Sequence, residues 1–358
     1  MKKNTLSRFS LLKMAAGLSA IVCCALISVS AHAEERGVVN IVGFSGVFAD
    51  NYKKFVIEPF KAKYPHIEVN YQQSKNSAES LALLTLQKNN PKIDVALIDV
   101  AVAIRANKQG LFAPLDPNIV GNLKDIPAWA NIDANRTIAF SQDNLSILYN
   151  TDNVKQPPGS WNDLTDSRYK GKIAAPLADT RGVILLPILT RLQGGDYKRS
   201  IEPGINVLKQ IAPNVSTWDP APDCYAVIQS GEADLAICWN GRAQYLHDTQ
   251  GGKIGIALPK EGSIGQTNTI NLVKGSANAH AAQLFVNYAI GAQAQTLFAE
   301  KSFYGPVNQA VTLPDAVAER IYGSKEAQAA QMSLDWPWVA EQYAPWIQRI
   351  RREVIALN

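Results

Sequence analysis

The 358-residue chain contains little of the chemistry that most enzymes need. Its four histidines and four cysteines are too few and too scattered to suggest a zinc cluster, and no CxxC pair is present. The P-loop, the GxGxxG turn and the HExxH motif are also missing. Beyond the N-terminus, no apolar run reaches the ~20 residues that a membrane-spanning helix needs. These absences argue against nucleotide, zinc and redox enzymes, so we predict no cofactor and no metal.

A nucleophile with its partners is equally hard to find. The segment Gly43-Phe44-Ser45-Gly46 stops short of a GxSxG nucleophile elbow, because Val47 stands where the last glycine belongs. Acidic pairs such as Asp94 and Asp99 are more simply solvated or capping groups. We therefore predict no catalytic residue. An exported α/β hydrolase stays open as the alternative, because a catalytic triad is recognised by its geometry.

Acidic residues are absent from the first 33 positions, which carry the cations Lys2, Lys3, Arg8 and Lys13. An apolar stretch follows at 14–29, and Ala31-His32-Ala33 provides a small-x-small cleavage site. This order is typical of a secretory signal peptide, and the stretch is short for a membrane anchor. We expect cleavage after residue 33 and a mature chain in the periplasm.

The mature chain also lacks net charge. Removing the four N-terminal cations from 35 lysines and arginines leaves 31, which equals the 31 aspartates and glutamates. A neutral chain gives no electrostatic reason to bind nucleic acid or an anionic membrane. We therefore expect neither as a partner.

Short apolar runs alternate with longer helical patterns along the chain. Predicted strands lie at residues 38–42, 67–71, 94–98, 172–175 and 233–238. Helical patterns separate them, as at 49–64, where Pro65 ends the helix, and at 182–192. Strands alternating with helices of 10–15 residues indicate parallel β-α-β units. The sequence therefore predicts an α/β fold with two lobes.

Segments that cross between the lobes are expected to form a hinge. Residues 137–149 contain no turn signal in their middle, and residues 254–271 are a candidate return crossing. Several crossings imply hinged lobes and not two domains on a flexible linker. We expect lobe I at 34–140, completed by 263–310, and lobe II at 141–262.

The C-terminal segment, 311–358, is predicted to be helical. Its residues Trp346, Ile347 and Ile350 share one helix face, which suits packing onto the body. A basic run, Arg349, Arg351 and Arg352, falls at the end of this helix, where cations are favoured or solvated.

Cys224 and Cys238 are the two cysteines of the expected mature chain. An oxidising compartment permits a disulfide between them, and their predicted positions on a helix and the following strand make it geometrically possible. Two small buried hydrophobes are the alternative. Sequence spacing cannot decide, because it does not show the Cα separation.

Aromatic and polar residues gather at the predicted carboxyl ends of strands, where open α/β sheets bind ligands. Trp239 and Asp99 each follow a strand, and Trp218 follows the apolar run 214–217. Trp239 is placed either to face a cleft or to cap the sheet core. Asp179 precedes a helix and either meets a ligand or caps that helix.

Several ordered motifs carry a resemblance to a known family. They are Asp94-Val95-Ala96-Leu97, Lys108-Gln109-Gly110-Leu111-Phe112, Pro158-Gly159-Ser160-Trp161-Asn162-Asp163-Leu164, Tyr169-Lys170-Gly171-Lys172-Ile173, Gly231-Glu232-Ala233-Asp234, Trp239-Asn240-Gly241, Pro259-Lys260-Glu261-Gly262 and Tyr304-Gly305-Pro306-Val307-Asn308. The chain resembles periplasmic solute-binding proteins of ABC importers, extracellular solute-binding family 1, and within them the spermidine/putrescine-binding branch. The resemblance covers nearly the whole mature chain.

The resemblance implies a Venus-flytrap fold whose lobes close on one small ligand and then dock on the transmembrane subunits of a permease. It implies a monomer that carries no catalysis. Carried over position by position, the cleft should include Phe44, Ser45, Asp99, Asp179, Arg181, Trp218, Trp239, the 266–268 segment with Gln266 and Asn268, and Tyr304. Aromatic walls suit such ligands because they cover methylenes and attract cations.

The chain departs from the polyamine pattern at three positions. Gly182 replaces a second-lobe glutamate, Asn268 replaces the aspartate that grips an amine, and Gln266 replaces an aromatic residue. Each lost charge partner would cost an ammonium about 1.5–3 kcal/mol. A naked di- or tri-cation therefore suits this cleft poorly.

Our hypothesis is a ligand with a cationic amine and an anionic end, such as γ-aminobutyrate, an opine or an aminophosphonate. Trp239 with Asp99 or Asp179 would hold the amine, and Arg181 or Arg242 would hold the anion. For Arg181, a structural salt bridge to Asp179 is an equally simple role. Polyamine binding stays open, and ferric iron is less favoured because no adjacent tyrosine pair lies near the cleft.

Overall fold

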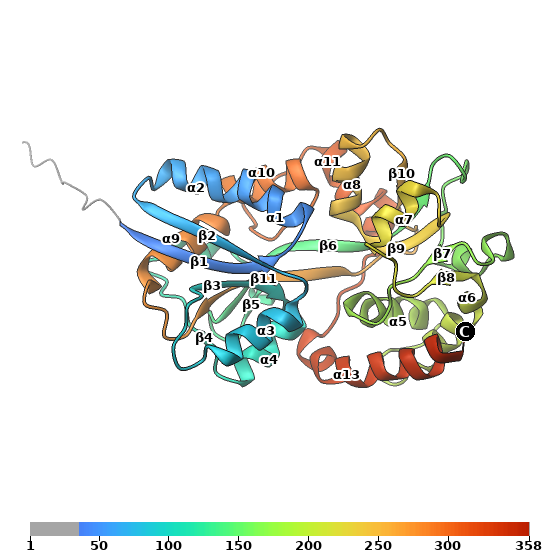
Figure 1. Cartoon of the computed structure of the whole chain (residues 1–358), viewed down its shortest axis with the longest axis horizontal. Helices are drawn as coiled ribbons and strands as arrows, with labels where there is room; N and C mark the ends of the chain where they lie inside the picture. Colours follow the sequence, from blue (N-terminus) through green and yellow to red (C-terminus); the bar gives the residue numbers. More distant parts are fainter. Residues whose placement is uncertain (1–35, 358) are drawn as a thin grey trace, which may run out of the picture. The chain divides into compact units, whose positions relative to one another are not determined.

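The computed structural model of the chain describes residues 36–357, so the predicted signal peptide lies outside the described residues. The main strands run side by side in the order β2-β1-β3-β11-β6-β9-β7-β8 (Figure 1). Their bounds are β1 Gly37–Phe44, β2 Ile67–Ser74, β3 Val95–Asp99, β6 Thr137–Asn150, β7 Ile173–Ala174, β8 Val215–Thr217, β9 Leu235–Trp239 and β11 Gly265–Val273. Short strands complete the sheet: β4 Phe112–Ala113, β5 Asn131–Ile132, β10 Ile254–Ala257 and β12 Gly305–Pro306.

The predicted parallel units are present at both ends of this strand order. Strand β1 pairs in parallel with β2 and β3, and β7 pairs in parallel with β8 and β9. Between them, β6 and β11 run antiparallel to their neighbours. The predicted α/β fold is therefore confirmed.

The helices follow the predicted pattern closely. They are α1 Val47–Tyr52, α2 Glu58–Lys63, α3 Ser77–Leu86, α4 Val100–Lys108, α5 Thr180–Leu192, α6 Glu202–Ile211, α7 Cys224–Ser230, α8 Asn240–Thr249, α9 Ala279–Ala289, α10 Ala292–Ser302, α11 Asp315–Tyr322, α12 Lys325–Ala329 and α13 Trp336–Glu353. A π-helical turn, Lys53–Ile57, joins α1 to α2, so the helix predicted at 49–64 is nearly continuous and ends before Pro65. No helix within residues 36–357 is long and apolar enough to cross a membrane.

Two hydrophobic cores lie on either side of the middle of β6. Core I is built around Ile41, Leu97 and Phe285, and core II around Ile184 and Leu235. Each large aliphatic or phenylalanine side chain buried in them stabilises the fold by about 1.5–3 kcal/mol. Helix α5 is buried from residue 182 to residue 190, as expected for a helix that is apolar on nearly every face.

Strand β6 connects the two cores, as its unbroken extended pattern predicted. Its residues 138–140 pack in core I, and Leu145 and Ile147 pack in core II. The predicted return segment, 254–271, forms two strands, β10 and β11, which both pair with β6. The predicted lobe boundaries near residues 140, 262 and 310 stay predictions.

The C-terminal helix α13 contacts both halves of the molecule. Trp346, Ile347 and Ile350 are buried in core II, on the face that the sequence predicted. Nearer its start, Ala340 packs against Val100, at the beginning of α4. Helix α13 therefore bridges α4 and α5, the helices that follow β3 and β7.

Candidate functional site

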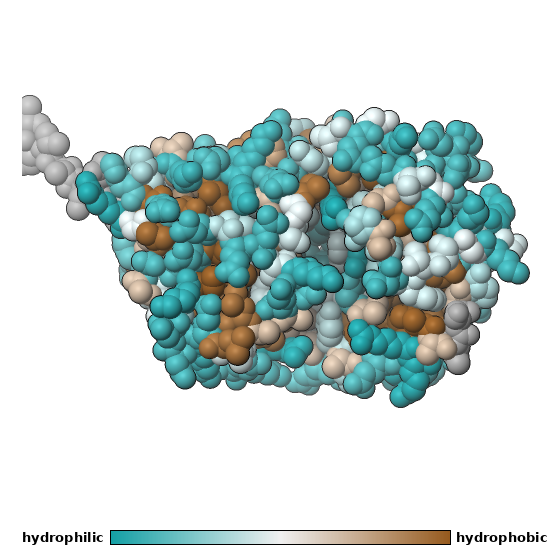
Figure 2. All heavy atoms as spheres, viewed as in Figure 1, coloured by the Kyte–Doolittle hydropathy of each residue, from teal (hydrophilic) through white to brown (hydrophobic). Residues whose placement is uncertain are grey.

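The surface is hollowed over the middle of β6, on the face drawn in Figure 2. Strands β3 and β9 end in this part of the sheet with Asp99 and Trp239. Helices α4, α5 and α8 begin close to these strand ends, at Val100, Thr180 and Asn240. Loops at strand ends thus supply most of the candidate residues, as expected for an open α/β sheet.

Asp99 is a partly buried carboxylate at the end of β3. Thr180 Oγ1 donates to its Oδ2 at 3.1 Å, and Gln266 Nε2 donates to its Oδ1. Burial, with a smaller contribution from the charge of Asp179, raises the pKa of Asp99 to about 7, against hydrogen bonds from Thr180 and Ser77 and the charge of Arg181, which lower it. Asp99 therefore changes its charge near neutral pH.

Thr180 connects Asp99 to the C-terminal helix. Its hydroxyl also shares a hydrogen bond of 3.0 Å with the Tyr343 hydroxyl of α13. The chain Tyr343–Thr180–Asp99 thus joins α13, α5 and β3. Sequence analysis named neither Thr180 nor Tyr343, since no local pattern predicts a contact between residues 163 positions apart.

Asp179 and Arg181 form a pair at the start of α5. Asp179 Oδ1 accepts from the Arg181 backbone N–H at 2.9 Å, as an N-cap, and from Arg181 Nε at 3.0 Å, while Nη2 donates to Oδ2. Arg181 Nη1 lies 3.7 Å from the sulfurs of Cys224 and Cys238. Burial works to lower the pKa of Arg181, but the charge and hydrogen bonds of Asp179 raise it overall. Asp179 therefore caps α5 and also forms a salt bridge with Arg181.

Arg242 on α8 is held differently. Its Nη2 donates to Asp223 Oδ2 at 2.6 Å, and its guanidinium lies 4.3 Å from the centre of the Tyr225 ring. Its Nε is buried and has no hydrogen-bond partner among the described residues. Its Nη1 lies 3.8 Å from the position that a Cβ would take on Gly46, in the loop after β1. Arg242 therefore points donors toward the opposite half of the molecule.

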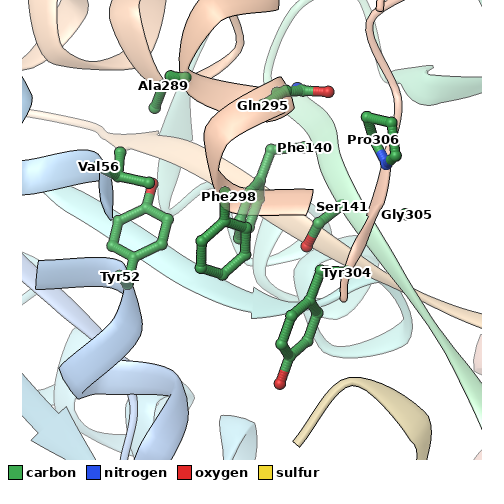
Figure 3. Close-up of a pocket in the computed structure, with 11 residues that line it drawn as sticks. Tyr52, Val56, Phe140, Ser141, Ala289, Gln295, Phe298, Tyr304, Gly305 and Pro306 are labelled. Carbon is green, nitrogen blue, oxygen red and sulfur yellow. The ribbon is translucent and has the colours of Figure 1, made fainter. Parts of the chain in front are cut away.

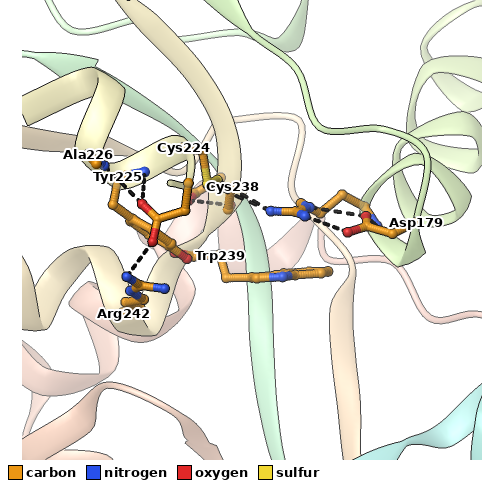
Figure 4. The surroundings of a disulfide bond; sticks show 10 residues. Asp179, Cys224, Tyr225, Ala226, Cys238, Trp239 and Arg242 are labelled. Carbon is orange, nitrogen blue, oxygen red and sulfur yellow. Dashed lines mark hydrogen bonds and ion pairs between the residues drawn. A yellow bond between two sulfur atoms is a disulfide. The ribbon is translucent and has the colours of Figure 1, made fainter. Parts of the chain in front are cut away.

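Cys224 and Cys238 form a disulfide, with their Cα atoms 6.6 Å apart (Figure 4). This answers the question that sequence spacing left open. The bond joins the first residue of α7 to β9, and both cysteines are buried. It therefore lies between the Arg181 and Arg242 ion pairs.

The two predicted tryptophans differ in their surroundings. Trp239 and Trp218 are partly buried and pack against core II. The Trp239 carbonyl accepts from the Tyr225 hydroxyl at 3.2 Å, and its ring reaches away from Arg242 toward the side where Asp179 lies (Figure 4). Trp239 thus lies between the two arginine pairs.

Asp143 is a buried carboxylate that sequence analysis missed. It lies on β6 and accepts from the Gly241 backbone N–H at 2.8 Å. Burial raises its pKa to about 7, against hydrogen bonds from the backbone of Gly241 and Asn240 and from the Tyr304 hydroxyl. A Cβ on Gly241 would lie 2.9 Å from the Tyr304 ring, so glycine permits this close approach of α8. The mostly buried strand around Asp143 gave no sequence signal for a site.

Tyr304 belongs to an aromatic group in core I. Its ring stacks on Phe298 with centroids 5.2 Å apart and meets Phe48 edge-on at 5.4 Å. The rings of Tyr304 and Phe298 lie beside a small cavity that Tyr52 also lines, and the Tyr304 hydroxyl points away from it (Figure 3). Core packing thus fixes the ring and leaves its hydroxyl for Asp143.

The remaining candidates lie in core I or at its edge. Phe44 is partly buried and packs edge-on against Phe48, 4.9 Å between centroids, while Ser45 is exposed. Asn268 is buried, donates to Ser141 Oγ at 3.1 Å and accepts from Gln266 Nε2 at 3.1 Å. Asn268 therefore orients Gln266, which in turn reaches Asp99.

The structure thus sorts the candidates into three groups. Asp99, Gln266 and Asn268 form one hydrogen-bonded group, Asp179 and Arg181 a second, and Arg242 with Asp223 a third. Within residues 36–357, Trp218 and Ser45 make none of the hydrogen bonds that define these groups. In the same residues, no group of three or more His, Cys, Asp or Glu side chains could hold a metal ion.

Comparisons with known proteins find solute-binding proteins that are similar to most of the chain. A probable ABC transporter periplasmic-binding protein of Sinorhizobium fredii is 28% identical over 76% of this chain and 75% of its own. A γ-aminobutyric acid-binding protein of Pseudomonas aeruginosa is 23% identical over 79% and 81%. The spermidine/putrescine-binding periplasmic protein of Escherichia coli is 24% identical over 75% and 82%. The relatives therefore agree on class and differ in ligand.

A solved structure supports the two-lobed fold. The periplasmic binding protein AgtB of Agrobacterium tumefaciens, in complex with agropinic acid, matches with a TM-score of 0.73 and 20% identity, over 90% of this chain and 99% of its own. The predicted Venus-flytrap fold is confirmed.

The family model described as bacterial extracellular solute-binding protein matches residues 56–322. Proteins of this family are solute-binding proteins and not enzymes, and membership implies a periplasmic location. The chain belongs to the bacterial extracellular solute-binding protein family.

Proposed function

We propose that this protein captures a small zwitterion, with one ammonium and one carboxylate or phosphonate, and delivers it to the permease of an ABC importer. The observation that carries the proposal is Nη1 of Arg242, which faces the loop of Gly46 in the opposite half and makes no hydrogen bond among the described residues. A guanidinium carries five N–H donors and binds carboxylate or phosphonate through two of them at once. Arg242 is therefore the group that receives the anionic end.

The energetic argument concerns the donors that the protein itself leaves unused. Asp223 occupies Nη2 of Arg242, and Tyr225 covers one face of the guanidinium. A buried donor without a partner costs about 1–3 kcal/mol, and more when the group is charged. A ligand anion at Nη1 would give this incompletely paired guanidinium a second charged partner. Arg181 is less suited, because Asp179 and the two sulfurs already surround its nitrogens.

Asp99 is the corresponding group for the ammonium. Burial raises its pKa to about 7, so its charge is incompletely compensated within the protein. An ammonium beside it would favour the ionised form and form charge-assisted hydrogen bonds. Trp239, between the two arginine pairs, would cover the methylenes that join the two ends of the ligand.

A polyamine is the second candidate, because Asp143 supplies another buried carboxylate with a pKa raised to about 7. Among the relatives, one is named for γ-aminobutyric acid and one for spermidine and putrescine. We favour the zwitterion, since Asp143 already accepts from Gly241 and Tyr304, whereas Arg242 keeps unused donors.

The test is a calorimetric titration of the mature chain with γ-aminobutyrate and with putrescine. The two molecules share a four-carbon chain and one ammonium, and they differ only in the second end group. We expect γ-aminobutyrate to bind and to raise the unfolding free energy by about 2.7 kcal/mol at a hundredfold excess over Kd, with no effect of putrescine. Binding of putrescine alone would overturn the zwitterion proposal. 2-Aminoethylphosphonate and an opine extend the panel on the same principle.

A further inference from the structure

The disulfide joins the two chain segments that hold Arg242. Cys224 follows Asp223, the carboxylate that pairs with Arg242, and precedes Tyr225, whose ring lies under the guanidinium. Cys238 lies four positions before Arg242, at the end of β9. One covalent bond therefore connects the support of the guanidinium to the guanidinium's own segment.

Hydrogen bonds reinforce the same junction. Asp223 Oδ1 caps α7 by accepting from the backbone N–H of Tyr225 and Ala226, at 3.1 and 3.0 Å. Its Oδ2 is thereby aimed at Arg242, 2.6 Å away. The Tyr225 hydroxyl donates to the Trp239 carbonyl at 3.2 Å, next to Cys238. Asp223 thus serves as helix cap and ion-pair partner through its two separate oxygens.

The geometry leaves Arg242 one orientation. With Nη2 on Asp223 and the guanidinium over the Tyr225 ring, Nη1 is the nitrogen that remains for a ligand, and it faces the loop of Gly46. A long, flexible arginine side chain otherwise loses up to ~2 kcal/mol of conformational freedom when a ligand fixes it. Fixing the side chain beforehand strengthens binding of any group that the guanidinium contacts, and the gain is larger for an anion, which makes the stronger, charge-assisted hydrogen bonds.

We propose that the Cys224–Cys238 disulfide and Asp223 are positioning groups for Arg242, so that the preference for an anionic ligand end depends on this covalent bond. The inference rests on the proposed function of Arg242. A disulfide that only stabilises the fold would support all ligands equally, because it would act by restricting the unfolded chain.

The experiment compares γ-aminobutyrate with γ-aminobutyramide, which has the same shape but a neutral end. The Kd ratio of the two ligands measures recognition of the negative charge. It is determined by calorimetry for the mature wild-type chain and for C224A/C238A, with C224S/C238S as the second variant should the first not fold. The matched control is Val207→Ala, which removes buried side-chain volume from core II on α6 and leaves α7 and α8 intact.

We expect the wild-type chain and V207A to prefer γ-aminobutyrate to the same extent. In the disulfide variant the preference should fall at least tenfold, mainly through weaker binding of γ-aminobutyrate. An unchanged ratio, or equal weakening of both ligands, would overturn the positioning role. If the wild-type chain binds γ-aminobutyrate without any preference over the amide, the proposed role of Arg242 fails first, so the two failures are distinguishable.

Discussion

Two arginine–aspartate pairs flank the same disulfide, and they differ in what they leave unused. Arg181 pairs with a residue two positions earlier and places its third nitrogen against the sulfurs. Arg242 pairs with Asp223, 19 positions away, and keeps a buried Nε without a partner in the described part of the chain. Their exposed side-chain fractions are similar, 19% and 29%. Burial alone therefore does not separate a structural arginine from a binding one.

The difference lies in the origin of each pair. Asp179 caps α5, and the same turn brings the Arg181 side chain to the Asp179 carboxylate. This ion pair therefore forms between residues of a single turn. Arg242 meets Asp223 only after α7, β9 and α8 have packed together. The tertiary contact uses Nη2 and leaves Nη1 directed at the loop of Gly46. An arginine positioned in this way is suited to receive a ligand anion.

The largest test of this comparison exchanges each arginine for glutamine. Arg242→Gln should weaken γ-aminobutyrate binding on the order of 100-fold, since the charge-assisted contact with the carboxylate is lost. Arg181→Gln should change Kd less than about threefold and instead lower Tm, because Asp179 loses its partner. Calorimetry and thermal unfolding measure the two effects. The comparison breaks down if Arg181→Gln weakens binding more than Arg242→Gln does.

The second largest loss of affinity is expected at Asp99, the proposed partner of the ligand's ammonium end. Asp99→Asn should weaken γ-aminobutyrate binding about 30-fold, because the ammonium keeps a hydrogen-bond acceptor but loses the charge. Asp94→Asn is the control, a buried aspartate elsewhere in core I that bonds Asn40. Equal weakening by both variants would show that the aspartate acts through stability.

Protonation of Asp99 should produce about a tenfold change in affinity between pH 8 and pH 6. An ammonium binds the ionised carboxylate, and a group with a pKa of about 7 is mostly ionised at pH 8 and mostly protonated at pH 6. Kd should therefore rise as pH falls. In Asp99→Asn this dependence should flatten, and a dependence that persists would point to Asp143, whose pKa is also raised to about 7.

The stability of the ligand-free chain should change with pH in the opposite direction to the ligand affinity. Asp99 and Asp143 have folded pKa values raised above the ordinary value of 3.8, so between about pH 4 and pH 7 the folded chain binds protons that the unfolded chain has released. The unfolding free energy contributed by these groups therefore decreases as pH rises through that range. Urea unfolding of the wild-type chain and of Asp99→Asn at the two ends of that pH range measures the contribution of Asp99 to the unfolding free energy.

A smaller loss of affinity is expected at Tyr343. Tyr343→Phe removes the hydroxyl that bonds Thr180 and should weaken ligand binding about threefold to fivefold, as for one neutral hydrogen bond. The effect should vanish in the background of Asp99→Asn, since Tyr343 acts through that carboxylate. Additive losses would contradict the coupling.

The fold was predictable because its signals are local. Alternating apolar runs located β1, β2, β3, β7 and β9, and the unbroken pattern at 137–149 identified β6 as a crossing segment. The Asp179–Arg181 pair was foreseeable for the same reason, since cap and partner lie within one turn. The return segment, 254–271, is divided into β10 and β11, whose separate pairings depend on β6.

The rest of the candidate site depends on tertiary contacts that no local pattern carries. Asp143 lies in a strand of buried residues and acquires its partners only when α8 and Tyr304 meet. Thr180 and Tyr343 approach Asp99 from two helices distant in sequence. Asp223 could have been suspected as the cap of α7, but its contact with Arg242 could not. Sequence reasoning therefore named both arginines without distinguishing them.

The most direct measurement is a double-mutant cycle between protein charge and ligand charge. The four Kd values of the cycle are those of γ-aminobutyrate and γ-aminobutyramide for the wild-type chain and for R242Q, and the same two ligands are measured on R181Q as the control. The account predicts that the wild-type preference for the carboxylate disappears in R242Q and persists in R181Q. A preference that survives in R242Q and disappears in R181Q would contradict the assignment of Arg242 to the anionic end.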